Sequence, residues 1–433
     1  MKKEIFYSVL EKIKPSEQEL KNIKELTAGL NKKIEAGLKK AHCRADVFLG
    51  GSLAKNTLIK KERYDIDIFV RFQYKEYAER DSQLSDMLEK ALKLQKIKYK
   101  KIHGSRDYFH FSAGGKKPVL FEIVPVLAIK KPQEARNVTD LSFFHVNYAS
   151  KHINDKIADE IRLAKAFCYA QNCYGAESHI QGFSGYALEL LVLHFGSLMN
   201  LAKNAVKWKV MLKNRKKIVI DPARHYKNAD DVLLQINEAK LVSPIILVDP
   251  TYAIRNATAS ISAETLLKFI DACKEFIAKP GKKSFEQKDI GEEIIKNARR
   301  RKALLAVISA KAEKSKEEVA PAKLRRFFDF IAFLMRKNSF DVLEKEIEFK
   351  RKEAKLYAVY RKPSSGMIVA GPPINRIVNL LKFKKKYKKV FVKDGKAFAK
   401  TKRRIRDING LLNFVRNGEE IKDMDVTKLR VIK

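Results

Sequence analysis

Two aspartates stand in a stretch that otherwise has the pattern of a buried strand. In "YDIDIFVRF", residues 64–72, acidic and apolar residues alternate, which would place Asp65 and Asp67 on one face and Ile66 and Ile68 on the other. Carboxylates on one face repel each other, and burying either without a partner is costly. A divalent cation removes that repulsion, and oxygen ligands favour Mg²⁺ or Mn²⁺ over zinc.

A third acid and a glycine–serine pair complement the aspartates. Glu122 is the single charge in the apolar run "VLFEIVPV", and if its strand neighbours the first, the carboxylates meet as a two-metal phosphoryl-transfer site requires. Gly51 would let the backbone approach a phosphate closely. Ser52, at or near the N-cap of a short helix, would bind triphosphate oxygens together with free backbone N–H groups.

Each feature has a more ordinary explanation when it stands alone. D-x-D is commonly a solvated edge or turn, and Gly-Ser is commonly a simple turn. An apolar strand, Gly-Ser, D-x-D about a dozen residues later and a further strand acid rarely occur together. The combination in this chain therefore predicts a nucleotide site.

This constellation resembles the nucleotidyltransferase superfamily related to DNA polymerase beta, and later motifs narrow the resemblance. "YGAE…GFSGY" and "DP…RN", with "FFHVNYASKHI" and "AGPP", resemble the archaeal-type (class I) CCA-adding enzymes, which are tRNA nucleotidyltransferases. The similarity runs from about residue 20 to beyond residue 380. It implies that C, C and A are added to the 3′ end of tRNA from CTP and ATP without a nucleic-acid template.

The resemblance also implies roles for single residues. The catalytic residues and ligands of two Mg²⁺ ions, with Mn²⁺ as the alternative ion, would be Asp65, Asp67 and Glu122. Lys55 would contact the triphosphate, although it stands where the family commonly has arginine and gives up bidentate geometry. The other nucleotide-binding residues would be Gly51, Ser52, His145, Lys165, Tyr174 and Arg255, the last of which would select the base.

Alternatives stay open for several of these residues. Glu122 is one methylene longer than the aspartate often found in relatives, which leaves its ligation open. His145 could be a satisfied histidine at a domain junction, and Tyr174 a core aromatic against the glycine turn. Arg255 could be a structural ion-pair partner, and Lys165 could be surface charge.

The excess of basic residues indicates a polyanionic partner. The chain has 90 Lys and Arg against 51 Asp and Glu and a net charge of +39, which attracts nucleic acid. The resemblance makes this partner tRNA, held by its acceptor stem and T-loop. The basic runs are residues 213–217, 297–305, 323–328, 382–389 and 400–407.

The four cysteines are scattered without C-x-x-C spacing, which favours a reducing cytoplasm over a disulfide framework or zinc site. No run has the length of a signal-peptide core or membrane helix, so we expect a cytoplasmic protein with no membrane partner. A homodimer is compatible with the resemblance.

We expect an α+β multidomain fold. Residues 1–142 would form a polymerase-beta-like catalytic palm, a mixed sheet with helices, and residues 143–262 a mainly helical domain that binds nucleotide and tRNA. Residues 263–433 would form a basic α+β C-terminal body and tail that bind tRNA. The apolar spacing predicts helices over 157–171 and 185–208, separated by a glycine-rich turn.

Other functions share parts of this pattern. A poly(A) polymerase-like enzyme and an enzyme that adds only CC or only A are the nearest alternatives. An inactive protein that binds structured RNA is the non-enzymatic alternative. An aminoglycoside-type nucleotidyltransferase shares Gly-Ser and D-x-D, but this chain is longer and far more basic than a small-molecule substrate calls for.

Overall fold

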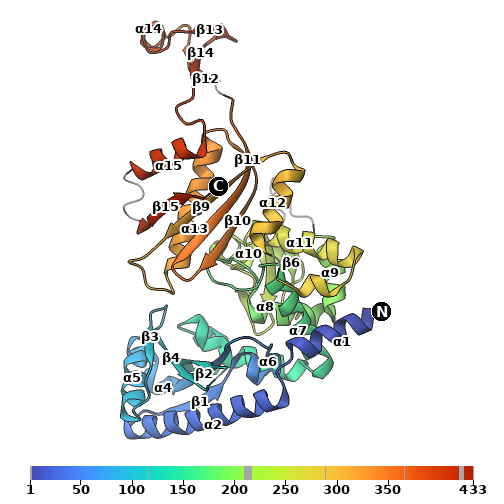
Figure 1. The fold of residues 1–433 in the computed structure, drawn as a ribbon. Helices are drawn as coiled ribbons and strands as arrows, with labels where there is room; N and C mark the ends of the chain where they lie inside the picture. Colours follow the sequence, from blue (N-terminus) through green and yellow to red (C-terminus); the bar gives the residue numbers. More distant parts are fainter. Residues whose placement is uncertain are drawn as a thin grey trace. The chain divides into compact units, whose positions relative to one another are not determined.

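The computed structural model describes residues 2–115, 117–208, 217–287, 289–364, 366–418 and 424–432. Residues 213–216, most of the first basic run, lie outside this description. The chain forms two compact units, Met1–Gln287 and Lys288–Lys433 (Figure 1). The α+β multidomain fold expected from the sequence is confirmed.

Two helices open the first unit. Helix α1 (Lys2–Ile13) ends before Pro15, and α2 (Glu17–Lys40) begins at the N-cap Ser16. The Ser16 hydroxyl accepts a hydrogen bond from the backbone N–H of Glu19, whose carboxylate accepts one from the Ser16 N–H. This reciprocal capping satisfies two of the donors that a helix start leaves open.

The first unit contains a five-stranded sheet with the strand order β1-β2-β5-β4-β3. Strands β2 (Tyr64–Gln73) and β5 (Val119–Ala128) are parallel, whereas the other neighbours are antiparallel. The remaining strands are β1 (Ala45–Leu49), β3 (Lys100–Ile102) and β4 (Tyr108–Ala113).

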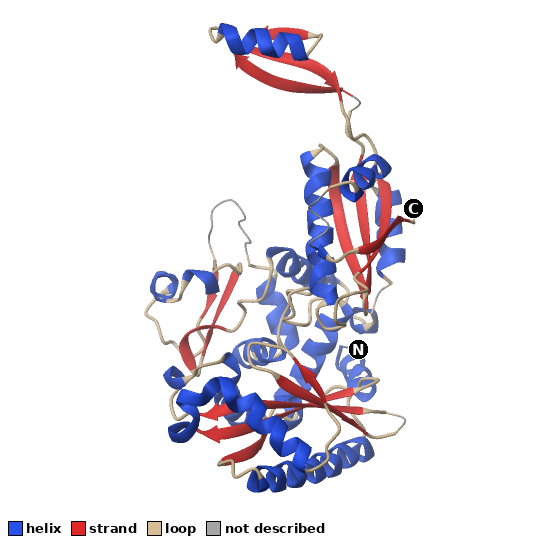
Figure 2. Cartoon of the chain, turned by 90° about the vertical axis from the view of Figure 1, so that its left-hand side faces the viewer, coloured by secondary structure: helices blue, strands red, loops and turns tan. Residues whose placement is uncertain are grey.

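Helices α2 and α5 (Leu84–Leu94) cover one face of this sheet (Figure 2). Alternate strand residues, among them Ile66, Ile68, Phe121 and Ile123, are buried under these helices. The other face carries the residues between them in sequence, which include the predicted acids. Short helical turns lie between the strands, namely α3 (Gly51–Ala54), α4 (Tyr74–Tyr77) and η1 (Ala78–Gln83). Two more, η2 (Pro132–Glu134) and η3 (Val138–Leu141), follow β5.

Helices dominate the rest of the first unit. They are α6 (Ser142–His152), α7 (Asp155–Ala170), α8 (Gly185–Phe195), α9 (Leu198–Ala205), α10 (Ala229–Gln235) and α11 (Ala263–Ala278), with the turns η4 (Glu238–Lys240) and η5 (Lys282–Phe285). A small sheet joins them, with the order β6 (Ile218–Ile220), β7 (Ile245–Asp249) and β8 (Tyr252–Asn256). Helix α11, beyond residue 262, packs into the same core as α7, α8 and α9.

The helix predicted over 185–208 is interrupted. Helix α8 ends at Gly196, whose φ of +80° is left-handed, and Ser197 caps the start of α9. The glycine ends the helix because it adopts this conformation without the steric penalty of a side chain. Among the described residues, no single helix has the length and apolar composition of a membrane span. The pair α8 and α9 meets both criteria only jointly, across a bend of 91°.

The second unit is built on a four-stranded antiparallel sheet. Its order is β10 (Asp341–Lys350), β11 (Glu353–Arg361), β9 (Leu304–Lys311) and β15 (Thr427–Val431). Helices α13 (Ala320–Lys337) and α15 (Ile408–Arg416) share one core with the sheet, and α12 (Ile290–Arg300) forms a second, smaller core with it. These sheet and helix contacts give the unit a hydrophobic interior of its own.

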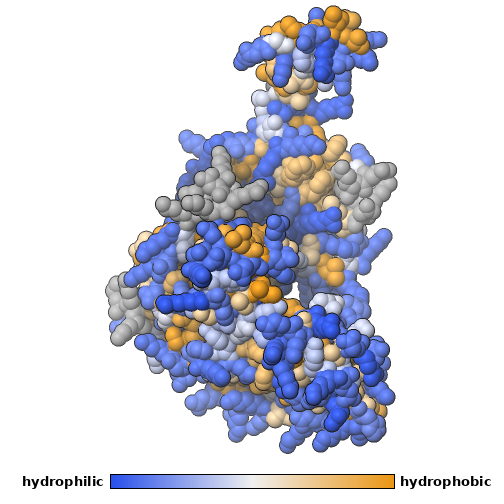
Figure 3. Space-filling model, turned by 180° about the vertical axis from the view of Figure 1, so that it is seen from behind, coloured by the Kyte–Doolittle hydropathy of each residue, from blue (hydrophilic) through white to orange (hydrophobic). Residues whose placement is uncertain are grey.

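A small module interrupts the second unit between β11 and α15. It consists of β12 (Gly366–Pro373), α14 (Ile377–Lys386), β13 (Val390–Lys393) and β14 (Lys396–Lys402). The apolar side chains Ile377, Val378 and Leu381 on α14 are more than half exposed, and hydrophobic atoms gather over this module in Figure 3. The basic run 382–389 continues from the same helix.

Candidate functional site

The three predicted acids lie on neighbouring parallel strands. Asp67 in β2 stands directly beside Glu122 in β5, and Asp65 lies two residues earlier in β2, beside Leu120. Because side chains alternate along a strand, all three carboxylates belong to the face that α2 and α5 leave free. The strand pairing expected from the sequence is thus present.

Mutual repulsion marks this cluster. Burial and the neighbouring Glu122 raise the pKa of Asp67 to about 7, while Lys55 and Lys165 act in the opposite direction. Two adjacent carboxylates are disfavoured as a pair of anions, and a divalent cation would remove that cost. The all-oxygen donor set therefore fits Mg²⁺ or Mn²⁺.

The acids also have protein partners. Asp65 pairs with Lys61 at 3.4 Å and with Arg63 at 3.3 Å, and His110 Nε2 lies 3.3 Å from Glu122 Oε1. Within the described ranges, no group of three or more His, Cys, Asp or Glu side chains is arranged to hold a metal ion as it stands. Bound ions would therefore compete with these protein partners. His110 was not predicted from the sequence, although it alternates with aromatic residues in β4.

Gly51 lies against the carboxylate of Asp67. Its φ of +62° is left-handed, and a Cβ added there would lie 1.8 Å from Asp67 Oδ2. The N–H of Gly50, the N-cap of α3, donates to the carbonyl oxygen of Asp67 at 2.9 Å. The glycine is thus required for the close approach of the β1–β2 connection to Asp67. Ser52 is the second residue of α3.

One pocket brings several predicted residues together. Ser52, Asp65, Lys165 and Tyr174 line it together with Thr57 and Lys61. These residues come from α3 and the segment after it, from β2, from α7 and from the turn after α7. Three predicted nucleotide-binding residues and one predicted metal ligand therefore face a common space.

Glu189 in α8 connects two of the predicted phosphate ligands. Lys55 Nζ lies 2.5 Å from one oxygen of Glu189, and Lys165 Nζ lies 3.1 Å from the other. The hydroxyl of Thr57 donates to Glu189 and accepts from Lys165. Lys165 is 2% exposed, so the surface-charge alternative is wrong. Sequence reasoning missed Glu189, although it is the lone acid in the apolar stretch "GYALELLVLHF".

Burial and pairing tune these charges in opposite directions. Burial lowers the pKa of Lys165 to about 8, although Glu189 opposes this shift. Burial alone would raise the pKa of Glu189, but Lys55 and Lys165 outweigh it and the pKa is lowered. Glu189 is therefore an anion that lies between two cations, Lys55 and Lys165. The three side chains together carry net positive charge next to the pocket, as a polyphosphate site needs.

Tyr174 lies at the glycine-rich turn that the sequence singled out. Its ring stacks on Tyr169 with a centroid distance of 4.2 Å, and its backbone bridges to Phe183. Gly175 follows with a φ of +124°. Burial raises the pKa of Tyr174 well above its ordinary value, so the phenol stays protonated. The ring is part of the core beside the pocket, as the structural alternative expected, and it also lines that pocket.

His145 and Arg255 meet at a second buried acid, Asp249. Arg255 Nη1 donates to Asp249 Oδ2 at 2.7 Å, and His145 Nε2 lies 3.0 Å from the same oxygen. Arg255 thus has the ion pair that the structural alternative proposed. Its side chain also lines a cavity of about 650 Å³ between the loop around residues 135–141 and strand β8. Such a volume suits a nucleoside-sized ligand.

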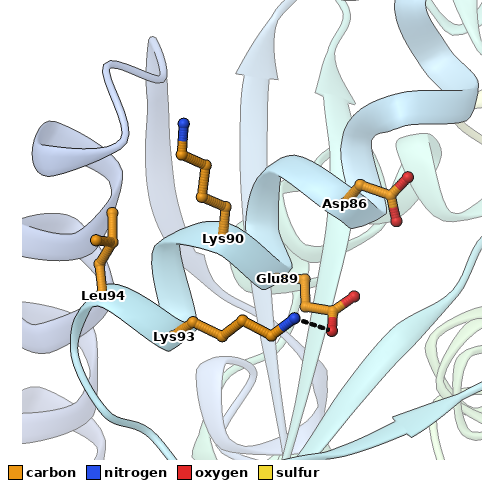
Figure 4. A pocket seen from close by; sticks show the side chains of 5 residues that line it. All are labelled: Asp86, Glu89, Lys90, Lys93 and Leu94. Atoms are coloured by element: carbon orange, nitrogen blue, oxygen red, sulfur yellow. Dashed lines mark ion pairs between the residues drawn. The ribbon is translucent and has the colours of Figure 1, made fainter.

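A further hollow lies on α5. It has a volume of about 520 Å³ and is lined by Asp86, Glu89, Lys90, Lys93 and Leu94 (Figure 4). Glu89 pairs with Lys93 at 2.9 Å, and α5 packs on the sheet face opposite the acids. The hollow is therefore separate from the candidate site.

Two family models match separate parts of the chain. Residues 1–144 match the family model of the Second Messenger Oligonucleotide or Dinucleotide Synthetase domain. Residues 159–286 match that of the second domain of tRNA nucleotidyltransferase. Among solved structures, a cytoplasmic RNA terminal U-transferase is similar to this chain with a TM-score of 0.50 and 14% identity. The match covers 67% of this chain and 99% of that one, and it shows similarity of fold alone.

Curated relatives cover most of the chain. The CCA-adding enzyme of Nanoarchaeum equitans is 34% identical over 82% of this chain and 83% of its own length. That of Methanocaldococcus jannaschii is 30% identical over 96% of this chain and 91% of its own length. The acids, the glycine turn and the buried groups around Glu189 and Asp249 thus occur in a chain that is related to these enzymes over most of its length. The chain belongs to the family of CCA-adding enzymes.

Proposed function

We propose that the protein adds C, C and A to the 3′ end of tRNA from CTP and ATP. The observation that carries this proposal is the placement of Asp67 beside Glu122, on the same sheet face as Asp65, next to a pocket that Ser52 and Lys165 share. The family membership supports the same reaction. In each step the 3′-hydroxyl oxygen bonds to the α-phosphorus of the nucleotide, the α–β bridging bond breaks, and pyrophosphate leaves.

Asp65, Asp67 and Glu122 would hold two Mg²⁺ ions, or Mn²⁺. When bound, such ions supply the positive charge that lowers the pKa of the attacking hydroxyl and neutralises the departing pyrophosphate. The pKa of Asp67, raised by Glu122 and burial, supports the fit because a dication is the partner that this pair lacks. Glu122 would serve as the third ligand once it leaves His110.

The phosphate side of the site is cationic. Ser52, Lys55 and Lys165 would bind the triphosphate, with Glu189 holding both lysines in place. A buried ammonium paired to a fixed carboxylate is already oriented, so little side-chain entropy is lost when the nucleotide binds. Tyr174 would close this side of the pocket.

The base and sugar would lie toward Asp249. Arg255 would present its remaining donors to the base, and His145 would contact the sugar or phosphates. The cavity of about 650 Å³ beside Arg255 would take the base and the 3′ end of the RNA. Arg136 and Lys240, which also line this cavity, would contact phosphates there.

The division of labour along the chain belongs to the same proposal. Residues 1–142 would act as the catalytic palm, 143–262 as the nucleotide- and tRNA-binding centre, and 263–433 as the basic body and tail. The tail would contact the acceptor stem and T-loop by shape and phosphates, since A-form RNA hides its sequence in a deep groove. Activity in the cytoplasm and assembly as a homodimer complete the proposal.

An extension assay tests this function. Purified protein with Mg²⁺ should extend tRNA that ends at the discriminator base by three nucleotides when CTP and ATP are both present. Reactions with one nucleotide at a time separate full CCA addition from CC-only or A-only addition. Long poly(A) products on any RNA would instead support the poly(A) polymerase-like alternative. Binding of tRNA without incorporation would support the inactive RNA-binding alternative.

Asp67→Asn should reduce extension by about 10³-fold or more, since the amide is neutral and binds a divalent cation weakly. The matched control is Asp86→Asn on α5, whose carboxylate is exposed and pairs with Lys101 on the far sheet face. The control should extend tRNA as the unaltered protein does. Equal activity of both variants would contradict the assignment of Asp67.

A further inference from the structure

Asp249 is a buried carboxylate whose contacts are all within the protein. Its side chain has no exposed surface. Oδ1 accepts hydrogen bonds from the Tyr186 hydroxyl at 3.0 Å, from the Thr251 N–H at 2.9 Å and from the Thr251 hydroxyl at 2.7 Å. Oδ2 faces Arg255 and His145. A carboxylate so fully occupied has no capacity left for a metal ion or substrate.

The same contacts fix four elements to one another. Asp249 ends β7, Arg255 lies in β8, His145 in α6 and Tyr186 in α8. The His145 ring stacks on Tyr186 at a centroid distance of 4.1 Å, and the Arg255 guanidinium lies 5.8 Å from the same ring. One carboxylate and one aromatic ring therefore set the positions of both side chains.

The charge of Asp249 is compensated by protein groups without any ligand. Burial alone would raise the pKa of Asp249, but His145 and Arg255 hold it well below its usual range. Burial lowers the pKa of His145, although Asp249 opposes this. Asp249 is thus an anion that contacts both the Arg255 guanidinium and the His145 imidazole.

Arg255 is anchored at one end only. Nη1 is taken by Asp249, and the described residues provide no other hydrogen bond to its guanidinium. The side chain is 23% exposed and borders the cavity of about 650 Å³. The free edge of a planar, anchored guanidinium can distinguish the acceptor pattern of one base from another, provided that its plane does not rotate.

Resting on the proposed function, we infer that Asp249 is a positioning residue for base selection, which acts by fixing the plane of the Arg255 guanidinium. It does not touch the reacting atoms. The choice of C and A over U and G depends on Asp249 through Arg255, whereas Glu189 holds the two lysines that are proposed to bind the triphosphate.

The test compares Asp249→Asn with the unaltered full-length protein in single-nucleotide extension of tRNA by CTP, ATP, UTP and GTP. The amide keeps the shape but loses the charge, so Arg255 is released. The ratio of kcat/KM for CTP over UTP should fall by about tenfold or more, with a larger change in KM than in kcat. Asp271→Asn, an exposed acid paired with Lys274 on α11, is the control and should keep the ratio.

A double-mutant cycle tests the route through Arg255. If Asp249 acts through Arg255, Asp249→Asn should change the selectivity of an Arg255→Ala protein by less than about twofold. Independent, multiplicative losses would overturn the inference. So would an Asp249→Asn protein that melts at lower temperature but keeps its selectivity, because that is the behaviour of a purely structural residue.

A second variant covers the case in which Asp249→Asn does not fold. Tyr186→Phe with Thr251→Val removes the two hydroxyl donors to Oδ1 and leaves the charge, so the carboxylate gains freedom to rotate. Its CTP-over-UTP ratio should also fall, and an unchanged ratio would overturn the inference. If the unaltered protein incorporates nothing, the proposed function fails. Calorimetric binding of CTP and UTP to the same variants then tests the role of Asp249 separately.

Discussion

Charge at the phosphate side of the site rests on a few buried residues. Lys55 and Lys165 are both less than 10% exposed, and Glu189 contacts the two of them. Lys55 gives a single ammonium 2.5 Å from Glu189. Such a point charge suits one carboxylate oxygen while Lys165 takes the other.

The first prediction concerns pH. Lys165 is charged below its pKa of about 8 and loses its proton as the pH rises through that value. The KM for CTP and ATP should therefore rise above about pH 8. In Glu189→Gln the favourable attraction to Lys165 is gone, so the rise should begin at a lower pH. Steady-state kinetics between about pH 6 and about pH 9 measures the dependence of KM on pH for the unaltered protein and for Glu189→Gln.

A compensating variant separates stability from binding in that experiment. Glu189→Gln leaves two buried ammonium groups without a counter-ion, which should lower the melting temperature. Adding Lys55→Met removes one of them and should recover much of the stability, but it should not recover the affinity for nucleotide. Identical pH profiles of the unaltered protein and Glu189→Gln would contradict the role given to Glu189.

At the scale of elements, the connection between β1 and β2 limits the space around the Asp67 carboxylate. Helix α3 begins immediately after Gly50, and Gly51 passes directly over the Asp67 carboxylate. Strand β2 lies between β1 and β5, so Asp67 belongs to an inner strand of the sheet. The turn would therefore act on Asp67, a proposed metal ligand, as well as on bound phosphates.

The second prediction is that Gly51→Ala displaces Asp67. The new methyl group would occupy the space of Oδ2 and would also require a left-handed backbone at alanine. A shift of about 1 Å at a catalytic group should cost about 100-fold in kcat. Extension kinetics with saturating CTP and ATP provides the measurement.

The control for that variant is Gly29→Ala in α2, where nothing lies within 4 Å of the added Cβ. Alanine favours helix, so this variant should keep full activity and melt at the same or a higher temperature. Full activity of Gly51→Ala would show that the approach to Asp67 is not needed.

At the scale of the whole molecule, the longest basic runs lie far from the three acids in the sequence. The carboxylates are in β2 and β5, whereas the basic runs 297–305, 323–328, 382–389 and 400–407 all fall in the second half of the chain. Several of them sit on exposed surface, such as Lys384, Lys385 and Lys386 at the end of α14. Such segments suit phosphate contacts along an RNA backbone.

The third prediction is steep salt dependence of tRNA binding. Contact with six or more phosphates should reduce the affinity by about 10³-fold or more between about 50 and 200 mM salt. Replacing Lys384, Lys385 and Lys386 by alanine should reduce the slope of log affinity against log salt by about one per lost contact. Fluorescence anisotropy with labelled tRNA measures both.

A control with the same loss of charge replaces Lys21, Lys24 and Lys32, which are exposed on α2. This variant should keep the original slope. Equal effects of the two triple variants would mean that net charge alone, and not the α14 module, determines the binding. Large differences in affinity between tRNA species would contradict recognition by shape and phosphates.

Local periodicity in the sequence was enough for the acids and for most elements. Alternation placed Asp65 and Asp67 on one strand face, Pro15 and Ser16 marked the start of α2, and the glycine turn marked the boundary before α8. These are properties of short segments, since strand and helix periods depend on neighbouring residues. The break at Gly196 was missed because an apolar pattern continues on both sides of it.

Only the tertiary structure decided which buried charges meet. Lys55 and Glu189 are 134 residues apart, and their contact exists because α8 packs beside the segment that follows α3. Asp249 gathers residues from α6, α8 and β8 in the same way. The sequence by itself determined which side chains could hold a metal ion or a phosphate. The packing of distant elements decided their partners, because a buried charge must be compensated by whatever group the fold brings within a few ångströms.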